Sequence, residues 1–184
     1  MSISITQHLR RVTVKTIPIY LAIGLLVFMA NPRVAWFLPG LLLVIAGEAI
    51  RVWAAGHLRK TKEVTTTGAY SYVKNPLYLG TLLILVGFCL MAANLWLLAV
   101  GLVIFILYYA PFKKKREGGR LRERFGEAWD DYDMAVPDYI PRLTPYPKRG
   151  NRDWSWEVFS ENSEDGTFLS VAFGIIILIL RFFY

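Results

Sequence analysis

The chain has 184 residues, of which 55% are hydrophobic and only 19% are charged. Because globular proteins average about 25% charged residues, this balance excludes a disordered chain and a nucleic-acid-binding tail. The formal net charge of +7 could favour nucleic acid, but only Glu48 and Glu63 of the 14 acidic residues come before residue 117, and long stretches carry no charge. The single cysteine, Cys89, excludes a framework of internal disulfides. We therefore predict an integral membrane protein.

Several apolar segments approach the roughly 20 residues that a membrane-spanning helix needs. The five segments run from about Val14 to Ala30, Val34 to Ala55, Pro76 to Ala93, Leu95 to Phe112 and Phe168 to Tyr184. Only Asn94 separates the third from the fourth, which predicts a tight antiparallel hairpin. The predicted fold is all-α: a multi-pass transmembrane helical bundle of about five spans that forms a single domain over residues 1–184.

Lysine and arginine residues predict the orientation of these spans. They flank the first span and are concentrated in residues 56–75 and 113–166, whereas only Arg33 and Arg181 fall on the opposite side. The positive-inside rule therefore places the N-terminus and both polar regions in the cytoplasm, in the inner membrane if the chain is bacterial. No small-residue cleavage site follows the first apolar stretch, so a signal peptide is not expected. Within the second polar region, residues 151–166 contain aromatic residues suited to a segment at the headgroup level, before the final helix at 168–184.

One helix face is predicted where the fourth span leaves the membrane. Lys113, Glu117, Leu121 and Phe125 recur every fourth residue and so share a face of a helix. The apolar members of this face should pack inward, which directs Lys113 and Glu117 toward the protein. In the second span, Glu48 and Arg51 are three residues apart, and we expect them to pair with each other.

Several common sites are missing from the sequence. It contains no dinucleotide-binding glycine motif, no phosphate-binding loop and no nucleophile elbow. His8, His57 and Cys89 are too few to build a zinc site, so no metal is predicted.

The segment before the third span has features of a binding loop. It turns at Gly68, and Pro76 is well placed to be the first residue of a helix whose free N–H groups could receive an anionic group. Tyr70, Tyr72 and Tyr78 add aromatic faces. The same pattern also fits an interfacial aromatic belt next to a proline-capped helix, and the loop alone does not separate the two interpretations.

Two motifs in this order resemble those of the isoprenylcysteine carboxyl methyltransferase family, which is related to phospholipid N-methyltransferases. The first is Lys74-Asn75-Pro76-Leu77-Tyr78, where that family has Arg-His-Pro-x-Tyr after a Gly-x-Tyr turn. The second follows the hairpin and comprises Glu117-Gly118-Gly119-Arg120-Leu121, Phe125-Gly126, Tyr132, Val136-Pro137 and Pro141. The resemblance covers a core of about residues 45–142.

The resemblance implies an S-adenosylmethionine site made by the cytoplasmic loop before the third span and by the helix after the fourth. Carried over by motif position, the cofactor-binding residues are His57, Lys62, Glu63, Val64, Thr65, Tyr70, Asn75, Pro76, Leu77, Tyr78 and Glu117. Lys113 and Glu117 stand where the family has its substrate-side arginine and its glutamate, and they are the predicted catalytic residues. The chain departs from the family motif at three positions: Asn75 replaces a histidine, Lys113 an arginine and Gly118 a second glutamate. These differences leave the identity of the substrate less defined than that of the cofactor.

The function implied is an S-adenosylmethionine-dependent methyltransferase acting on a lipophilic acceptor, such as an isoprenylcysteine-type carboxylate. Its expected partners are the lipid bilayer and that acceptor, with no nucleic acid and an open oligomeric state. Three alternatives remain: a phospholipid or small-molecule N- or S-methyltransferase, a nicotinamide-dependent sterol-type reductase on a related membrane fold, and a non-enzymatic membrane subunit.

Overall fold

The computed structural model describes residues 24–60, 62–162 and 164–183, and the secondary structure within these ranges is entirely helical. The elements are α2 (Val34–Ala55), the 3-10 helix η1 (Gly68–Ser71), α3 (Pro76–Met91), α4 (Leu95–Ile104), the π-helical η2 (Phe105–Tyr109), α5 (Ala110–Phe125), α6 (Glu127–Ala135), α7 (Trp156–Glu161) and α8 (Asp165–Phe183). The predicted all-α class is confirmed for the described part of the chain.

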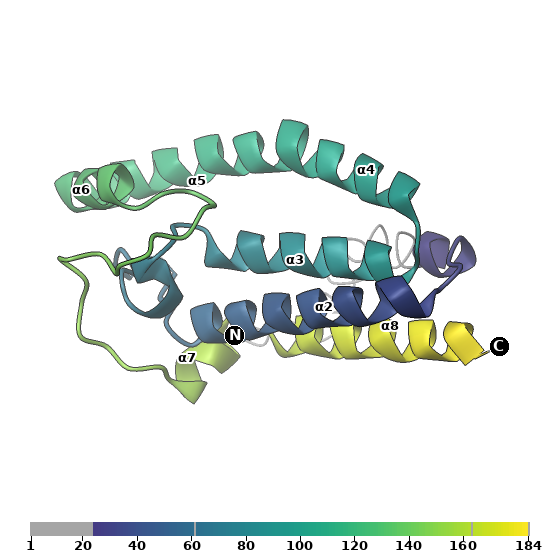
Figure 1. Cartoon of the computed structure of the whole chain (residues 1–184). Helices are drawn as coiled ribbons and strands as arrows, with labels where there is room; N and C mark the ends of the chain where they lie inside the picture. Colours follow the sequence, from purple (N-terminus) through teal and green to yellow (C-terminus); the bar gives the residue numbers. More distant parts are fainter. Residues whose placement is uncertain (1–23, 61, 163, 184) are drawn as a thin grey trace, which may run out of the picture.

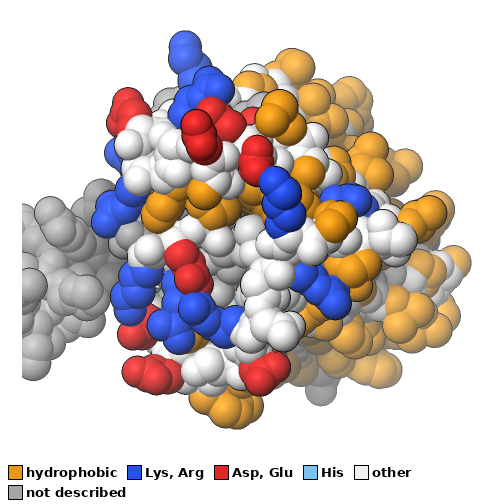
Figure 2. Space-filling view, turned by 90° about the vertical axis from the view of Figure 1, so that its left-hand side faces the viewer, with side chains coloured by type: hydrophobic (Ala, Val, Ile, Leu, Met, Phe, Trp, Pro, Cys, Tyr) orange, Lys and Arg blue, Asp and Glu red, His pale blue; other side chains and the backbone are white. Residues whose placement is uncertain are grey.

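Helices α2, α3 and α8 run side by side, and α4, η2 and α5 form one long rod that passes along α3 (Figure 1). The loop between α2 and α3 and the chain between α5 and α8 lie at the same end of this bundle. Lys, Arg, Asp and Glu side chains gather over that end, with hydrophobic side chains along the flanks behind it (Figure 2). The two predicted polar regions therefore lie on one side of the protein, as expected from the charge pattern. Their placement in the cytoplasm stays a prediction.

Glycine residues allow α2 and α3 to pack backbone against backbone. A Cβ atom added at Gly40 would lie 2.6 Å from the carbonyl oxygen of Gly87, and one added at Gly47 would lie 2.6 Å from that of Gly80. Small residues at such positions are typical of helix pairs in membranes, where van der Waals packing replaces the hydrophobic effect as the source of association. Val44 and Met91 are fully buried beside these glycines, in a cluster that α8 completes.

The predicted hairpin between the third and fourth spans is confirmed. Helix α3 ends at Met91, Ala93 has a positive φ of 50°, and the Asn94 side chain accepts a hydrogen bond from the backbone N–H of Leu97 at 3.0 Å. This cap satisfies one of the amides that a helix start leaves unpaired. Ala93 therefore provides the left-handed residue of the turn, and Asn94 caps the start of α4.

The structure supports part of the five-span prediction. Val34–Ala55 and Gly166–Phe183 are long and apolar enough to cross a membrane, whereas Pro76–Met91 and Leu95–Leu107 are shorter apolar helices. Most of the first predicted span, Val14 to Ala30, lies outside the described residues. Two spans are thus supported by length and composition, and five remain a prediction.

The glycine contact makes a stability prediction. Gly87→Ala should lower the free energy of unfolding by about 1–3 kcal/mol, because the new methyl group would push α2 and α3 apart. Gly119→Ala on α5 is the matched control: nothing lies within 4 Å of its added Cβ, so the change should be neutral or should stabilise the helix by up to about 1 kcal/mol. Thermal unfolding of both variants in detergent measures the difference, and equal behaviour would contradict the packing.

Candidate active site

A hydrogen bond joins the two motifs. The Tyr78 hydroxyl, in the first turn of α3, donates to Oε2 of Glu117 in α5 at 2.6 Å. On α5, Leu121 and Phe125 are half-buried like Glu117, which confirms that this face points inward. The backbone of Lys113 belongs to α5, but its side chain lies outside the described part of the structure.

Lys74 fastens the first motif to the chain after α6. Its side chain is only 6% exposed, and its Nζ lies 2.5 Å from Oδ1 of Asp133 and 3.2 Å from Oδ1 of Asp138. The Lys74 N–H also donates to the carbonyl of Pro137 at 2.9 Å, and Asn75 Nδ2 donates to the carbonyl of Asp138 at 3.2 Å. Sequence reasoning missed the positioning role of Lys74, although two aspartates on either side of Val136-Pro137 were a visible signal.

Tyr70 lies inside this corner of the protein. Its carbonyl accepts a hydrogen bond from the Tyr132 hydroxyl at 2.7 Å, which ties η1 to α6. Burial is the largest cause of a raised pKa for the Tyr70 phenol, and the nearby Tyr132, Glu164 and Glu117 raise it further. Tyr70 is therefore a neutral group, suited to packing and hydrogen bonding rather than to accepting a proton.

The start of α3 offers fewer free amides than predicted. Pro76 is buried at the first helical position and has no N–H. The N–H groups of Tyr78 and Leu79 both donate to the carbonyl of Asn75, at 3.1 and 3.0 Å. The expected anion site at this helix end is correspondingly weaker.

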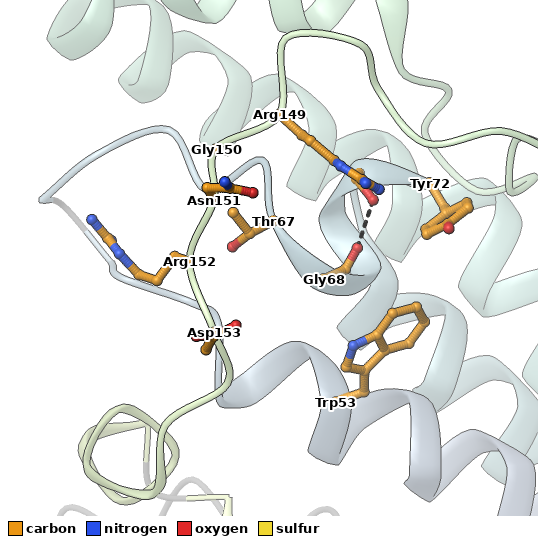
Figure 3. Close-up of a pocket in the computed structure, with 10 residues that line it drawn as sticks. Trp53, Thr67, Gly68, Tyr72, Arg149, Gly150, Asn151, Arg152 and Asp153 are labelled. Carbon is orange, nitrogen blue, oxygen red and sulfur yellow. Dashed lines mark hydrogen bonds between the residues drawn. The ribbon is translucent and has the colours of Figure 1, made fainter.

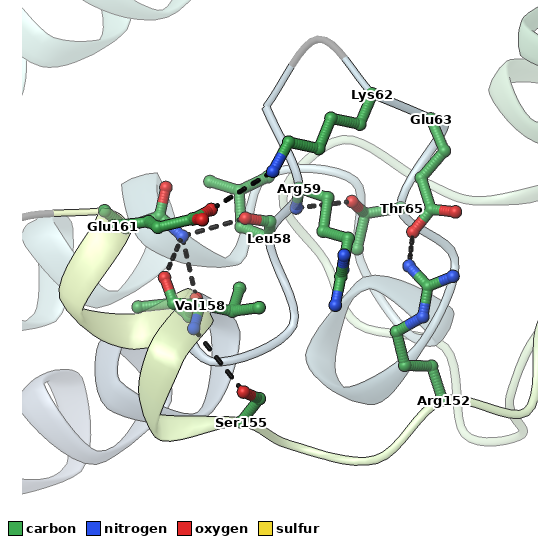
Figure 4. Close-up of polar contacts among 11 residues, drawn as sticks. Leu58, Arg59, Lys62, Glu63, Thr65, Arg152, Ser155, Val158 and Glu161 are labelled. Atoms are coloured by element: carbon green, nitrogen blue, oxygen red, sulfur yellow. Dashed lines mark hydrogen bonds and ion pairs between the residues drawn. The ribbon is translucent and has the colours of Figure 1, made fainter.

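His57 and Thr65 lie in the loop after α2, and their side chains form hydrogen bonds with other residues of the same loop. Nδ1 of His57 is 3.1 Å from Oγ1 of Thr67, and burial lowers the His57 pKa, with Asp153 acting in the opposite direction. The ring packs on Gly68, whose φ of +56° and lack of a side chain both suit the position. Oγ1 of Thr65 accepts from the backbone N–H of Arg59 at 3.2 Å (Figure 4). These contacts give both residues a structural role in shaping the loop.

Lys62, Glu63 and Val64 line a cleft of about 450 Å³ between this loop and the α5–α6 corner. Its other lining residues are Thr66, Phe125, Ala128, Asp131, Tyr146 and Lys148. Lys62 Nζ lies 3.5 Å from Glu161, and Glu63 forms an ion pair with Arg152 (Figure 4). The structure thus places Lys62, Glu63 and Val64 at this cleft, and Tyr78 with Glu117 at the hydrogen bond between α3 and α5. Leu77 packs instead against the cluster of Ala54, Ala69 and Tyr70.

Arg51 does not form the expected ion pair with Glu48. It forms an ion pair with Glu164, at the start of α8, and donates to Oγ1 of Thr81 at 2.7 Å and to the carbonyl of Leu77 at 3.2 Å. The reason is the close approach of α3 at Gly80, which directs the arginine across to the neighbouring helix rather than along its own. Among the described residues, Oε2 of Glu48 is buried without a hydrogen-bond partner.

Comparisons with known proteins agree with these motifs. A family model described as phospholipid methyltransferase matches residues 35–128. The chain is 35% identical over 107 residues to the nickel-cobalt-cadmium resistance protein NccN of Alcaligenes xylosoxydans xylosoxydans, a match covering 57% of this chain and 49% of that protein. It is 33% identical over 123 residues to the cobalt-zinc-cadmium resistance protein CzcN of Cupriavidus metallidurans, covering 66% of this chain and 55% of that protein. The chain therefore spans about half the length of these curated relatives, and no solved structure matches it.

The Lys74 contacts predict a measurable loss of stability. Lys74→Ala should lower the free energy of unfolding by about 1–3 kcal/mol, because it leaves two carboxylates without their buried cation. Lys148→Ala removes a pair with Asp131 in which the lysine side chain is 72% exposed, and its effect on stability should be small by comparison. Denaturant unfolding in detergent compares the two variants. An equal loss of unfolding free energy would argue against a stabilising role for the Lys74 ion pairs with Asp133 and Asp138.

Proposed function

We propose that this chain, which belongs to the phospholipid methyltransferase family, transfers a methyl group from S-adenosylmethionine to a lipophilic acceptor at the membrane surface. The observation that carries the proposal is the 2.6 Å hydrogen bond between Tyr78 and Glu117, because it brings together the two motifs on which the family resemblance depends. Its geometry gives the site one carboxylate and one phenol, held by helices of the protein core.

The residues present fit the proposed cofactor. The cleft beside Lys62, Glu63 and Val64 has the volume typical of small-molecule sites, roughly 300–1,000 Å³. Phe125 and Tyr146 supply aromatic faces for a purine, and the carboxylates that line the cleft are acceptors for ribose hydroxyls. S-adenosylmethionine supplies a methyl group on a positively charged sulfur. Glu117 does not line the cleft but lies two turns before Phe125 on α5, and we assign it to the positive charges at the methyl-bearing end of the cofactor.

The remaining task of the protein is to bring an acceptor into line with the methyl group and to exclude water. A carboxylate acceptor is ionised at neutral pH and needs no base, whereas an amine must first lose a proton. Tyr70 is buried and neutral, so it suits the wall of such a site better than a role in proton transfer. This favours a carboxylate acceptor of the isoprenylcysteine type.

The acceptor is proposed to reach the site from the bilayer. Helix α4 has no buried side chain among its ten residues, so its apolar surface is available to lipid or to a lipophilic substrate. Lys113 follows on the same rod, one turn before Glu117, and we assign its ammonium to an anionic group of the acceptor. The family description favours a phospholipid amine as the second candidate. The relatives' names concern metal resistance, which fits the remaining alternative of a non-enzymatic membrane subunit.

Cofactor binding is the first test. Glu117→Ala should weaken the binding of S-adenosylmethionine by roughly ten- to a hundred-fold, since a charged hydrogen bond is worth about 1.5–3 kcal/mol. Glu123→Ala removes an exposed carboxylate from the same helix and should leave the affinity unchanged. Calorimetry on detergent-purified protein measures both. Wild-type affinity in a folded Glu117→Ala protein, or binding of NADPH in place of S-adenosylmethionine, would refute the proposal.

The acceptor is tested through Lys113. Lys113→Ala should reduce methyl transfer at least ten-fold while cofactor affinity stays within about two-fold, because its proposed partner is the acceptor. Lys113→Arg should keep much of the activity, and Lys115→Ala is the matched control for a lost positive charge. Radiolabelled methyl incorporation into farnesyl-cysteine analogues and into phospholipid extracts distinguishes the two acceptor classes. Normal turnover in Lys113→Ala would leave that lysine only a role in membrane topology.

A further inference from the structure

A second cleft, of about 390 Å³, lies between η1 and residues 149–153 (Figure 3). Its lining residues are Trp53, Thr67, Gly68, Ser71, Tyr72, Arg149, Gly150, Asn151, Arg152 and Asp153. None of the residues assigned above to the cofactor or the acceptor lines it. Any ligand of this cleft therefore belongs to a separate site.

The wall formed by residues 149–153 is held in place on both sides. The N–H of Gly150 donates to Oγ1 of Thr66 at 3.1 Å, Arg152 forms an ion pair with Glu63, and the N–H of Ser155 donates to the carbonyl of Gly56 at 3.1 Å. The cleft is thus a fixed feature of the fold, defined by contacts at both ends of this wall.

Arg149 is the cation that remains available in this cleft. Its guanidinium points into the space beside Tyr72, and among the described residues no carboxylate pairs with it (Figure 3). Two of the hydroxyls that line the cleft are already engaged: Thr67 with His57, and Ser71 with the carbonyl of Gly68. Asp153 lies at the opposite end of the cleft from the guanidinium. An anionic group would accordingly bind at the Arg149 end, and a planar guanidinium suits a phosphate or carboxylate.

The cleft lies beside the exposed side of α2, through its lining residue Trp53. Trp53 belongs to the last turn of this candidate span, is 43% exposed, and has its ring centroid 6.1 Å from that of Tyr72. Tryptophan and tyrosine in such a place mark the headgroup level of a bilayer. Below Trp53, the same side of α2 presents a strip of exposed apolar residues, namely Ala49, Ile45, Leu42 and Leu38.

We propose that this cleft binds the phosphodiester of a glycerophospholipid, with the phosphate on Arg149 and the acyl chains along the exposed strip of α2. The cation, the interfacial aromatic pair and the apolar strip occur in the order in which a lipid presents its phosphate, its glycerol backbone and its tails. The bound lipid is a structural partner that anchors the polar end of the protein to the membrane surface. We assign it a role apart from methyl transfer, because none of the residues assigned to the cofactor or the acceptor lines this cleft.

The test uses the full chain in detergent and three probes: dioctanoyl phosphatidylglycerol, dioctanoylglycerol, which has the same tails and no phosphate, and inorganic phosphate. Binding is followed by native mass spectrometry and calorimetry. Arg149→Gln should weaken phosphatidylglycerol binding roughly ten-fold or more. Arg33→Gln, at the exposed N-terminal end of α2, should leave phosphatidylglycerol binding unchanged. Trp53→Leu should weaken lipid binding while leaving cofactor affinity intact.

We expect phosphatidylglycerol to bind more tightly than either of the other two probes. We also expect this binding to depend on Arg149 but not on Arg33. Equal affinity for inorganic phosphate would make this a free-phosphate site and overturn the lipid assignment. Equal affinity for dioctanoylglycerol, or wild-type lipid affinity in a folded Arg149→Gln protein, would also overturn it. These outcomes are independent of methyl transfer, so failure here leaves the proposed function standing.

Discussion

The backbone contact between α2 and α3 is the constraint on which the rest of the structure depends. With glycines at each closest approach, the two helices meet so tightly that their relative register is fixed. Arg51 is consequently placed over Gly80, where it can reach the carbonyl of Leu77 and the side chain of Thr81. Those contacts hold the first turn of α3, which carries Tyr78. A sliding of α2 along α3 by one turn, about 5.4 Å, would break each of these contacts at once.

The polar end of the molecule is organised around that first turn. Chain segments from α6 onward contact the residues just before this turn, by hydrogen bonds to the backbone of residues 70–72 and by the buried ion pairs of Lys74. Arg51 also connects α8 to this end of the molecule, because its ion-pair partner Glu164 directly precedes α8. Glu164 lies outside the residues 35–128 that the family model matches, whereas Arg51 lies within them. The C-terminal part of the chain therefore contributes to the geometry of a site whose motifs lie elsewhere.

Hydropathy and motif spacing predicted much of this arrangement. The helical class, the hairpin at Asn94 and the inward face of α5 could be derived from local patterns. The family resemblance singled out Tyr78 and Glu117, and the structure joins them by a hydrogen bond. The partners of Lys74 and Arg51 could not, because Asp133 and Glu164 lie 59 and 113 residues away along the chain. Their pairing depends on how closely whole helices approach one another, which a local pattern does not encode. The expected Glu48–Arg51 pair failed for the same reason, since proximity along one helix was outweighed by a neighbouring helix.

The central claim is that the loop before α3 and the stretch of α5 from Lys113 to Phe125 form one S-adenosylmethionine site. Hydrogen–deuterium exchange on the detergent-purified chain, with and without S-adenosylmethionine, tests it most directly. The account predicts that the cofactor slows exchange in residues 62–79 and 113–125 together, at the same saturating concentration, while residues 34–50 of α2 stay unchanged. Protection confined to one of the two segments, or protection only around residues 149–153, would contradict a shared site.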